Sequence, residues 1–359
     1  MDYNSKKCSI SSSVLILSLI LATIIILLLC SWEPLIYKIL FLQSKNHLSN
    51  TNYNSTLIEE KDELQIALEK ASTANKTVII AVVNKAYVES DEYPAMFDLF
   101  LEGFWAGEGT GPLVAHLLVV SMDQAAHERC EFRRLNCYRL KAASGDGGDD
   151  FAGEKVYMTE GFIEMMWQRT SFLLDVLNRG FSFIFTDTDV LWLRNPFPKL
   201  SNNETLDFQI STDNFNGNPT SKKNLINTGF YFIRSNNKTI SLFQTWYDTR
   251  TNATGLKEQD VLVNLVRGGV LEKLGLKAKF LDTLYFSGFC KDSRDVKEVA
   301  TVHANCCRSI KAKVADLKMV LRDWNTFKKN DKLNVIDSKN MTDNFRWSIH
   351  RSCIDSWHI

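Results

Sequence analysis

Three uninterrupted apolar runs separated by helical stretches constrain the fold more than any other feature of this sequence. The runs are TVIIAVV, AHLLVVSM and FSFIF, at residues 77–83, 115–122 and 181–185. A strand without polar alternation is typical of a parallel sheet that is covered on both faces. Residues 94–105 and 159–180 have helical periodicity, and Thr159 and Gly180 are the expected cap and stop of the second helix. This alternation predicts an α/β fold with a mostly parallel sheet.

The same pattern continues to the end of the chain. Further strands are predicted at residues 207–212, 229–235, 278–282 and 299–305, and further helices at 239–250 and 257–267. No internal repeat is visible, and the acidic, glycine-rich stretch SGDGGDDFAGE is typical of a surface loop. One domain over residues 76–359, with a sheet sandwiched by helices, accommodates all of these elements.

The N-terminal segment predicts a membrane anchor. Residues 14–30 carry no charge, and with their neighbours they form an apolar segment over residues 10–32, close to the roughly 20 residues that a bilayer core requires. Lys6 and Lys7 precede it and favour a cytoplasmic tail at residues 1–9. A cleaved signal peptide is the alternative, but the apolar run exceeds a typical signal core and no small-x-small site follows it.

Residues 33–75 are polar and poor in aromatic side chains, and they end in the short amphipathic piece LIEEKDELQIALEKA. This composition predicts a stem that holds the following domain away from the membrane. The anchor and the stem together predict a single-pass type II protein whose domain faces a lumen.

Sequons and cysteines agree with a lumenal domain. N-x-Ser/Thr sequons begin at Asn54, Asn75, Asn203, Asn237, Asn252 and Asn340. Cysteines beyond the anchor form an even set that can pair in an oxidising compartment, with free buried thiols as the alternative. We expect Cys130 to pair with Cys137, and the adjacent Cys306 and Cys307 to take different partners, because a bridge between neighbours is strained.

The charge balance argues against one class of partner. Lys plus Arg and Asp plus Glu are equal at 42 each, so no overall basic field favours nucleic acid. Any phosphate that the protein binds must be met by a local site.

The stretch FTDTDVLWLRNPF supplies a candidate for such a site. It places Asp187 and Asp189 just after the strand at residues 181–185, and open α/β sheets bind ligands at the carboxyl ends of their strands. Buried carboxylates need a partner, and oxygen ligands on a tight turn suit Mg²⁺ or Mn²⁺ completed by substrate phosphates. An EF-hand loop is excluded, because its sixth-position Gly and twelfth-position Glu are missing.

Several motifs also carry a family resemblance. MMWQRTSFLLDVLNRG, FTDTDVLWLRNPF, NTGFYFIRSN, EQDVL, FLDTLYFSGFC and VHANCC follow one another within residues 78–324. In this order they resemble the plant nucleotide-diphospho-sugar transferases of glycosyltransferase family 77. The resemblance implies a GT-A, Rossmann-like fold in a type II Golgi membrane protein. It implies transfer of a pentose such as xylose or arabinose, or of galactose, from a UDP-sugar to a wall polysaccharide or glycoprotein with retention.

The resemblance assigns the metal ligands. Asp187 and Asp189 match the Asp-x-Asp motif, whose second carboxylate binds Mn²⁺ and whose first reaches the ribose and sugar as well. His303 matches the C-terminal histidine that completes metal coordination. An imidazole beside carboxylates favours Mn²⁺, with Mg²⁺ as the alternative. Two carboxylates in an empty site would repel each other, so Asp189→Asn is expected to raise the melting temperature of the metal-free protein.

Further positions match residues that face the sugar and the acceptor. Asn227 and Gly229 lie in NTGF, and Asp260 lies in EQDVL. Asp260 is expected to orient the acceptor hydroxyl or face the anomeric carbon, with a helix N-terminal acid as the structural alternative. The order of residues does not separate front-face attack from a route through Asp260.

The remaining donor contacts are assigned by position. Lys313, or its neighbour Lys311, is expected to meet the diphosphate, with a solvated helix face as the alternative. Asn84 follows the first strand and is expected to bind uracil, or else to stabilise a turn. Arg169 is expected to contact phosphate or to pair on its own helix.

Two departures from the family pattern affect the acceptor and diphosphate contacts. Relatives usually read His-Asp-Gln-Asp where this chain has LKEQD, and they have Gly at the place of Ser309. A catalytically silent sugar-binding or scaffold protein with the same fold is the alternative function, and the presence of the metal ligands argues against it.

Overall fold

The computed structural model describes residues 61–90, 94–141, 152–155, 157–332 and 345–358. The predicted cytoplasmic tail and membrane anchor lie outside these residues, as does the stem up to residue 60. Among the helices of the described ranges, none is both long enough and apolar enough to cross a bilayer.

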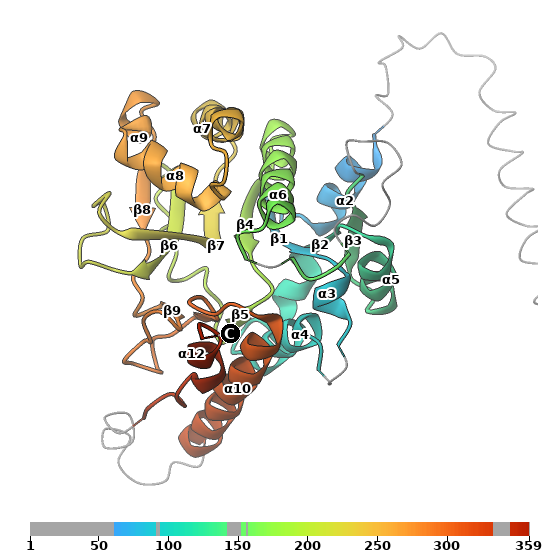
Figure 1. Cartoon of the computed structure of the whole chain (residues 1–359), viewed down its shortest axis with the longest axis vertical. Coiled ribbons are helices and arrows are strands. Elements are labelled where there is room, and N and C mark those ends of the chain that lie inside the picture. Colours follow the sequence, from blue (N-terminus) through green and yellow to red (C-terminus); the bar gives the residue numbers. More distant parts are fainter. Residues whose placement is uncertain (1–60, 91–93, 142–151, 156, 333–344, 359) are drawn as a thin grey trace, which may run out of the picture. The chain divides into compact units, whose positions relative to one another are not determined.

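A mixed sheet runs through the centre of the domain. Its strands are β1 (Thr77–Val83), β2 (Leu117–Ser121), β3 (Asn136–Arg139), β4 (Ser182–Thr186), β6 (Phe208–Asn214), β7 (Leu225–Ile233) and β8 (Ala278–Phe280). Within the described residues their order is β3-β2-β1-β4-β7-β6-β8 (Figure 1). Neighbouring strands pair in parallel except at β7, which is antiparallel to β4 and to β6. The predicted mostly parallel α/β sheet is therefore confirmed.

A second, smaller sheet lies beyond the end of β4. It contains β5 (Val190–Trp192), β9 (Phe286–Gly288) and β10 (Thr301–His303), in the order β5-β10-β9. β10 runs antiparallel to β5, and His303 is opposite Val190. Because Val190 directly follows Asp189, this register brings His303 to the Asp-x-Asp turn.

Helices cover both faces of the large sheet. They are α2 (Glu63–Ala71), α3 (Lys85–Val88), α4 (Met96–Ala106), α5 (Gln124–Phe132), α6 (Glu160–Asn178), α7 (Asn237–Asp248), α8 (Glu258–Arg267), α9 (Val270–Lys273), α10 (Ile310–Lys332) and α12 (Arg351–Asp355), with 3₁₀ turns η1 (Gly111–His116) and η2 (Thr249–Asn252). Figure 1 shows α6, α7 and α8 on one side of the sheet and α4 and α10 on the other.

Alternate side chains of β1 enter the two hydrophobic cores that result. Val78 and Ile80 pack among residues of α6, α7 and α8, whereas Ile79 and Ala81 pack among residues of α4 and α5. This double burial is the reason for the uninterrupted apolar sequence of the strand. A third core joins α4 and α10 to β5 and β10, and it attaches the small sheet to the rest of the domain.

The long helix α6 begins and ends where the sequence predicts. The Thr159 side chain accepts a hydrogen bond from the backbone N–H of Phe162, which satisfies a donor that the first turn leaves open. After the helix, Gly180 adopts a φ of 80°, a conformation that glycine adopts without steric cost. The helix thereby delivers the chain into β4.

The amphipathic end of the predicted stem belongs to the folded domain. In α2 the Leu64, Leu68 and Ala71 side chains are buried and contribute to the same core as α6 and α7. The Asp62 side chain caps the helix at Gln65. The residues of α2, which the sequence assigns to the stem, therefore pack with the domain. The sequence shows the amphipathic pattern of α2, but it does not show that the apolar face of this helix packs against the core that includes α6 and α7.

The described cysteines form disulfides. Cys130 pairs with Cys137 as predicted, linking α5 to the start of β3. Cys306 and Cys307 take different partners, also as predicted, and these are Cys290 and Cys353. The alternative of free buried thiols is wrong for these six residues. The last bridge holds α12 against the segment between β10 and α10.

If α2 is an integral part of the domain, Leu68→Ala should lower the free energy of unfolding by about 2–4 kcal/mol, because it leaves a cavity in a fully buried position. Ile66→Ala on the same helix is the matched control, since Ile66 is 55% exposed. That change should stay within about 0.5 kcal/mol. Urea denaturation of both variants measures the difference, and equal small effects would mean that α2 does not stabilise the domain.

Candidate active site

A cavity of about 430 Å³ opens at the carboxyl ends of β1 and β4. Its walls come from α6, the turn after β4, the first half of β7, the start of α8, and the segment from β10 into α10. The predicted site residues that line it are Asn84, Arg169, Asp187, Asp189, Asn227, Gly229, Asp260, His303 and Lys313. Residues from distant parts of the sequence thus meet at the sheet edge where the sequence places a ligand site.

Lys311 is the exception among the predicted residues. It is exposed and does not line the cavity, whereas Lys313, two positions later on α10, does. Because residues two apart on a helix point in different directions, only one of the two lysines can face the site. The structure places Lys313 there.

The Asp-x-Asp turn is fixed by backbone contacts. The N–H of Asp187 donates to the carbonyl of Gly229 on β7 at 2.7 Å, and the N–H of Val190 donates to the carbonyl of Asp187 at 3.3 Å. The backbone of Asp189 is held as well, because its carbonyl accepts from the N–H of Ala304 at 3.0 Å. Both carboxylates are therefore presented by a turn that is bonded to β7 and to the end of β10.

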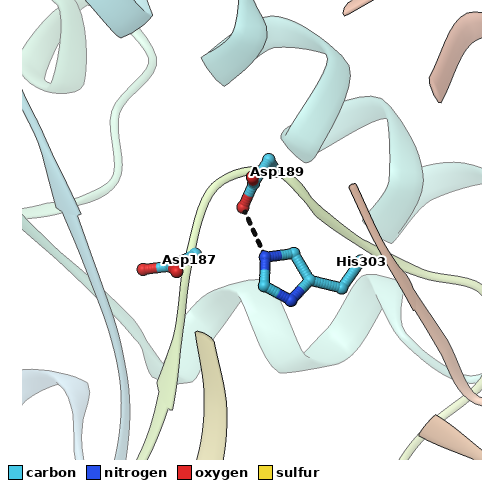
Figure 2. Close-up of side chains that lie close together, drawn as sticks. All are labelled: Asp187, Asp189 and His303. Atoms are coloured by element: carbon cyan, nitrogen blue, oxygen red, sulfur yellow. Dashed lines mark ion pairs between the residues drawn. The ribbon is translucent and has the colours of Figure 1, made fainter. Parts of the chain in front are cut away.

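Asp189 is a buried carboxylate with two cationic neighbours. It is 3% exposed, and its oxygens lie 3.2 Å from His303 Nε2 and 2.7 Å from Lys313 Nζ. Figure 2 shows the imidazole pointing at this carboxylate. Burial alone would raise the pKa of Asp189, but Lys313 and His303 together hold that pKa below its ordinary value.

The pKa values of His303 and Lys313 shift in the direction opposite to that of Asp189. Burial alone would lower the pKa of His303 and of Lys313, because it disfavours the charged form, but Asp189 raises both pKa values above their ordinary range. The protonated forms of His303 and Lys313 are therefore favoured next to the Asp189 carboxylate. A cation that binds Asp189 would compete with these two groups for the carboxylate.

Asp187 has a different environment. The Asp187 side chain is 31% exposed, and its partial burial raises its pKa above the ordinary value, while an ion pair of 2.9 Å with Arg169 opposes the shift. Arg169 also donates to Glu258 at 2.6 Å and lies over the ring of Phe185. Since both ends of the guanidinium bind carboxylates, Arg169 holds Asp187 and Glu258 in place rather than pairing within its own helix.

Gly229 is required by the close approach of the metal-ligand candidates. A Cβ atom at this position would lie 2.3 Å from His303 Cε1 and 2.8 Å from Asp187 Oδ2. Both distances are far inside van der Waals contact. Asn227 supports the same strand end, because its side-chain oxygen accepts from the N–H of Gly229 at 2.8 Å.

Two site residues were not predicted from the sequence. Glu258 is 2% exposed and accepts hydrogen bonds from Arg169 and Thr228 through one oxygen, while its other oxygen has no partner among the described residues. Asp213, at the end of β6, accepts from the side-chain amides of Asn227 and Asn305. A signal for Glu258 existed, since it lies two residues before Asp260 in the same motif, but the helix register was needed to see that both reach the cavity.

Asn84 and Asp260 lie at different parts of the cavity wall. Asn84 follows β1, is 2% exposed and donates to the carbonyl of Gly153 at 3.3 Å. Asp260 is in the first turn of α8, beside the motif residues that bind Thr228. These positions are compatible with the predicted base contact and acceptor contact respectively.

Three side chains could together hold a metal ion. Single ligand atoms of Asp187, Asp189 and His303 all lie within 4.8 Å of one another. Neighbouring ligands around a six-coordinate ion at ~2.1 Å lie about 3 Å apart, and opposite ligands about 4 Å apart. The observed spacing is therefore close to what one ion needs, and carboxylate plus imidazole is a donor set suited to Mn²⁺.

Comparisons with known proteins place the chain among enzymes that use nucleotide-linked sugars. Residues 112–317 match the family described as nucleotide-diphospho-sugar transferase. An uncharacterized protein of Arabidopsis thaliana is 54% identical over 312 residues, which cover 86% of this chain and 89% of that protein. Beta-arabinofuranosyltransferase RAY1 of Arabidopsis thaliana is 29% identical over 260 residues, which cover 68% of this chain and 44% of that protein.

Some solved structures align with this chain at low sequence identity. The galactosyltransferase LgtC aligns with a TM-score of 0.41 and 12% identity, covering 74% of this chain and 99% of that chain. The family match contains the Asp-x-Asp turn, His303 and Lys313, while Asn84 lies before its first residue.

The structure reverses the expected effect of Asp189→Asn on stability. Asp189 faces two cationic groups, so neutralising it leaves Lys313 without its ion-pair partner instead of relieving repulsion. In the presence of a chelator, Asp189→Asn should lower the free energy of unfolding by about 3 kcal/mol, at the lower end of the cost of removing one partner of a buried ion pair. Differential scanning calorimetry measures the change.

Asp260→Asn is the control for this measurement. Asp260 lines the same cavity but has no ion pair within the described part of the chain, so its replacement should cost less than about 0.5 kcal/mol. A higher melting temperature for Asp189→Asn would support carboxylate repulsion and contradict the ion-pair account.

Proposed function

Because this chain belongs to the nucleotide-diphospho-sugar transferase family, we propose that it transfers a sugar from a UDP-linked donor to a glycan or glycoprotein, with Mn²⁺ in the site. The observation that carries the proposal is the convergence of Asp187, Asp189 and His303 at the carboxyl end of β4. Acidic residues and an imidazole at this place, beside a cavity large enough for a nucleotide, suit a metal–diphosphate complex.

The bound ion would neutralise the diphosphate as it leaves the sugar, which is the main electrostatic demand of such a transfer. Asp189 and His303 are the proposed principal ligands, and Asp187 is the third. Arg169 keeps Asp187 in position through the ion pair described above. Lys313 now pairs with Asp189. The phosphate oxygens of the donor would compete with Asp189 for the Lys313 ammonium and could bind it instead.

The reacting sugar would lie between the metal ligands and the start of α8. Asn227, Gly229 and Asp260 line this part of the cavity with Glu258. Asn84, at the end of β1, is the proposed contact of the uracil base, which fits the binding of nucleotides at strand ends in α/β folds. Donor and acceptor bound together would exclude water from the reaction, which favours transfer over hydrolysis.

The substrate class is proposed from the similarity to relatives. The similarity to a beta-arabinofuranosyltransferase supports a pentose such as arabinose or xylose as the transferred sugar, with galactose as the alternative. We propose the GT-A class of fold and a retaining reaction on the resemblance described above. The acceptor is proposed to be a wall polysaccharide or a glycoprotein.

The proposed location is the Golgi membrane, with a type II anchor at residues 10–32 and the domain in the lumen. Disulfides support an oxidising compartment. Sequon asparagines within the described residues are exposed, as glycosylation requires, and these are Asn75, Asn203, Asn237 and Asn252. Protease treatment of sealed vesicles tests this topology, and digestion of the domain in intact vesicles would contradict it.

A catalytically silent sugar-binding protein is the alternative. It predicts nucleotide-sugar binding without release of UDP. The presence of Asp187, Asp189 and His303 together argues against this alternative. A buried cluster of charged groups is costly, and a protein without catalysis would not need to keep it. Measuring UDP release distinguishes the transferase from the silent sugar-binding protein.

The activity test is a screen of UDP-sugars with the purified full-length protein, measuring UDP release with Mn²⁺ and with chelator. Asp189→Asn should lower the rate on the order of a hundredfold or more, because a principal electrostatic stabiliser is lost. Asp248→Asn, an exposed change outside the cavity, is the matched control and should leave the rate intact. Full metal-dependent activity in Asp189→Asn would remove the proposed site.

Metal binding should also depend on pH in a defined direction. The pKa of His303 is raised above 6.5 in the metal-free protein, and the ion requires the neutral imidazole. Mn²⁺ affinity should therefore be constant above the pKa that His303 has in the folded protein. As the pH falls below that pKa, the affinity should fall by up to about tenfold per pH unit. Isothermal titration calorimetry over this range provides the measurement.

His303→Ala is the control for the pH effect. The variant should bind Mn²⁺ more weakly, because water replaces one ligand, and it should lose most of the pH dependence between neutral and mildly acidic conditions. If wild type and His303→Ala show the same pH dependence, His303 is not the titrating ligand.

A further inference from the structure

The rim of the cavity exposes two aromatic side chains. Trp357 is 46% exposed and Tyr157 is 41% exposed, and both line the cavity. Large exposed aromatic surfaces on a folded domain are costly and commonly mark binding sites. Neither side chain has a role in the proposed donor and metal site.

Trp357 is held in a defined orientation. Its indole N–H donates to the carbonyl of Cys306 at 2.8 Å. The preceding residue accepts a hydrogen bond from the backbone N–H of Arg308, and the disulfide between Cys307 and Cys353 ties α12 to the same segment. An exposed ring with one hydrogen bond of its own, on a backbone held by two further contacts, loses less conformational entropy when a ligand packs on it.

Trp357 is held by the segment between β10 and α10, which contacts both sides of the cavity. On one side, the N–H of Ile310 donates to Glu154, next to Gly153, which binds Asn84. On the other side, a series of contacts leads to β6. Cys306, which binds the indole, is bridged to Cys290, and the N–H of Cys290 donates to Asn305. Asn305 in turn binds Asp213 at the end of β6. In the sheet, β6 and β1 are on opposite sides of β4, and the proposed base contact Asn84 follows β1.

Cationic groups accompany both aromatic rings. The guanidinium carbon of Arg308 lies 4.1 Å from the ring centroid of Trp357, and Lys257 Nζ lies 5.1 Å from that of Tyr157. Arg308 is exposed, and within the described ranges neither cation forms an ion pair. A flat guanidinium with free N–H groups beside an exposed indole is suited to a carboxylate attached to a ring.

We propose that Trp357 and Arg308 form an acceptor subsite for a uronic acid residue, with Lys257 adding positive charge at the same rim. The C–H face of the sugar ring packs on the indole, and its carboxylate takes two hydrogen bonds from the guanidinium. This inference rests on the proposed function for its place in the reaction, since it assigns the acceptor side of the same cavity.

The test uses calorimetric binding of two oligosaccharides of equal length to the full-length protein, one of galacturonic acid and one of galactose. Wild type should bind the acidic one roughly tenfold more tightly, as expected of a charge-assisted hydrogen-bonded pair. Arg308→Gln should abolish that difference. Trp357→Leu should weaken both by roughly tenfold, because it removes the aromatic face while keeping an apolar side chain, and Trp357→Phe should weaken them less.

Two matched controls lie outside the cavity lining. Trp105 is 66% exposed on α4, and Arg351 is exposed on α12. Trp105→Leu and Arg351→Gln should bind both oligosaccharides as wild type does. Thermal melting of each variant separates loss of binding from loss of folding, and Trp357→Phe provides the result if Trp357→Leu does not fold.

A parallel titration with UDP and Mn²⁺ separates this inference from the proposed function. Weaker UDP binding by Arg308→Gln would assign the guanidinium to the diphosphate and overturn the acceptor subsite. Equal affinity of wild type for the two oligosaccharides, or wild-type affinity in Trp357→Leu, would overturn it as well. If wild type does not bind UDP but the oligosaccharide effects are observed, the proposed transferase function fails while the uronate site stands.

Discussion

The buried Asp189 carboxylate is the group on which the arrangement of the candidate site depends. A carboxylate at 3% exposure has to be paired, and its partners come from β10 and the first turn of α10. The pairing of β10 with β5 sets His303 opposite the residue that follows Asp189. The third hydrophobic core then packs α10 against the small sheet and α4. Strand pairing and hydrophobic packing thereby bring His303 and Lys313 to Asp189.

The two carboxylates of the Asp-x-Asp turn differ in a way that suits an exchange of partners. The pKa of Asp189 is lowered by its cationic neighbours, whereas the pKa of Asp187 is raised by burial in spite of Arg169. In the proposed reaction, Asp189 and His303 would hold the metal ion, and Lys313 would pair with the diphosphate in place of Asp189. Each buried charge would then keep a partner.

Much of the fold follows from local sequence, because buried strands and capped helices have strong local signals. β1, β2, β4 and α6 were predicted from apolar runs and a Thr–Gly pair. β5 and β9 have three residues each and were missed, since their pairing is decided by tertiary contacts. In the site, Asp187, Asp189 and His303 could be predicted from position and resemblance. Glu258, Asp213 and the choice between Lys311 and Lys313 depend on helix register and on strands from elsewhere in the chain, which a single sequence does not provide.

Anomalous diffraction from crystals of the protein grown with Mn²⁺ and UDP tests the central claim most directly. We predict one Mn²⁺ peak within about 2.3 Å of an Asp189 carboxylate oxygen and of His303 Nε2, with Lys313 moved from Asp189 to a phosphate oxygen. A structure in which UDP is bound, Lys313 still pairs with Asp189 and no Mn²⁺ peak lies at the Asp-x-Asp turn would contradict it.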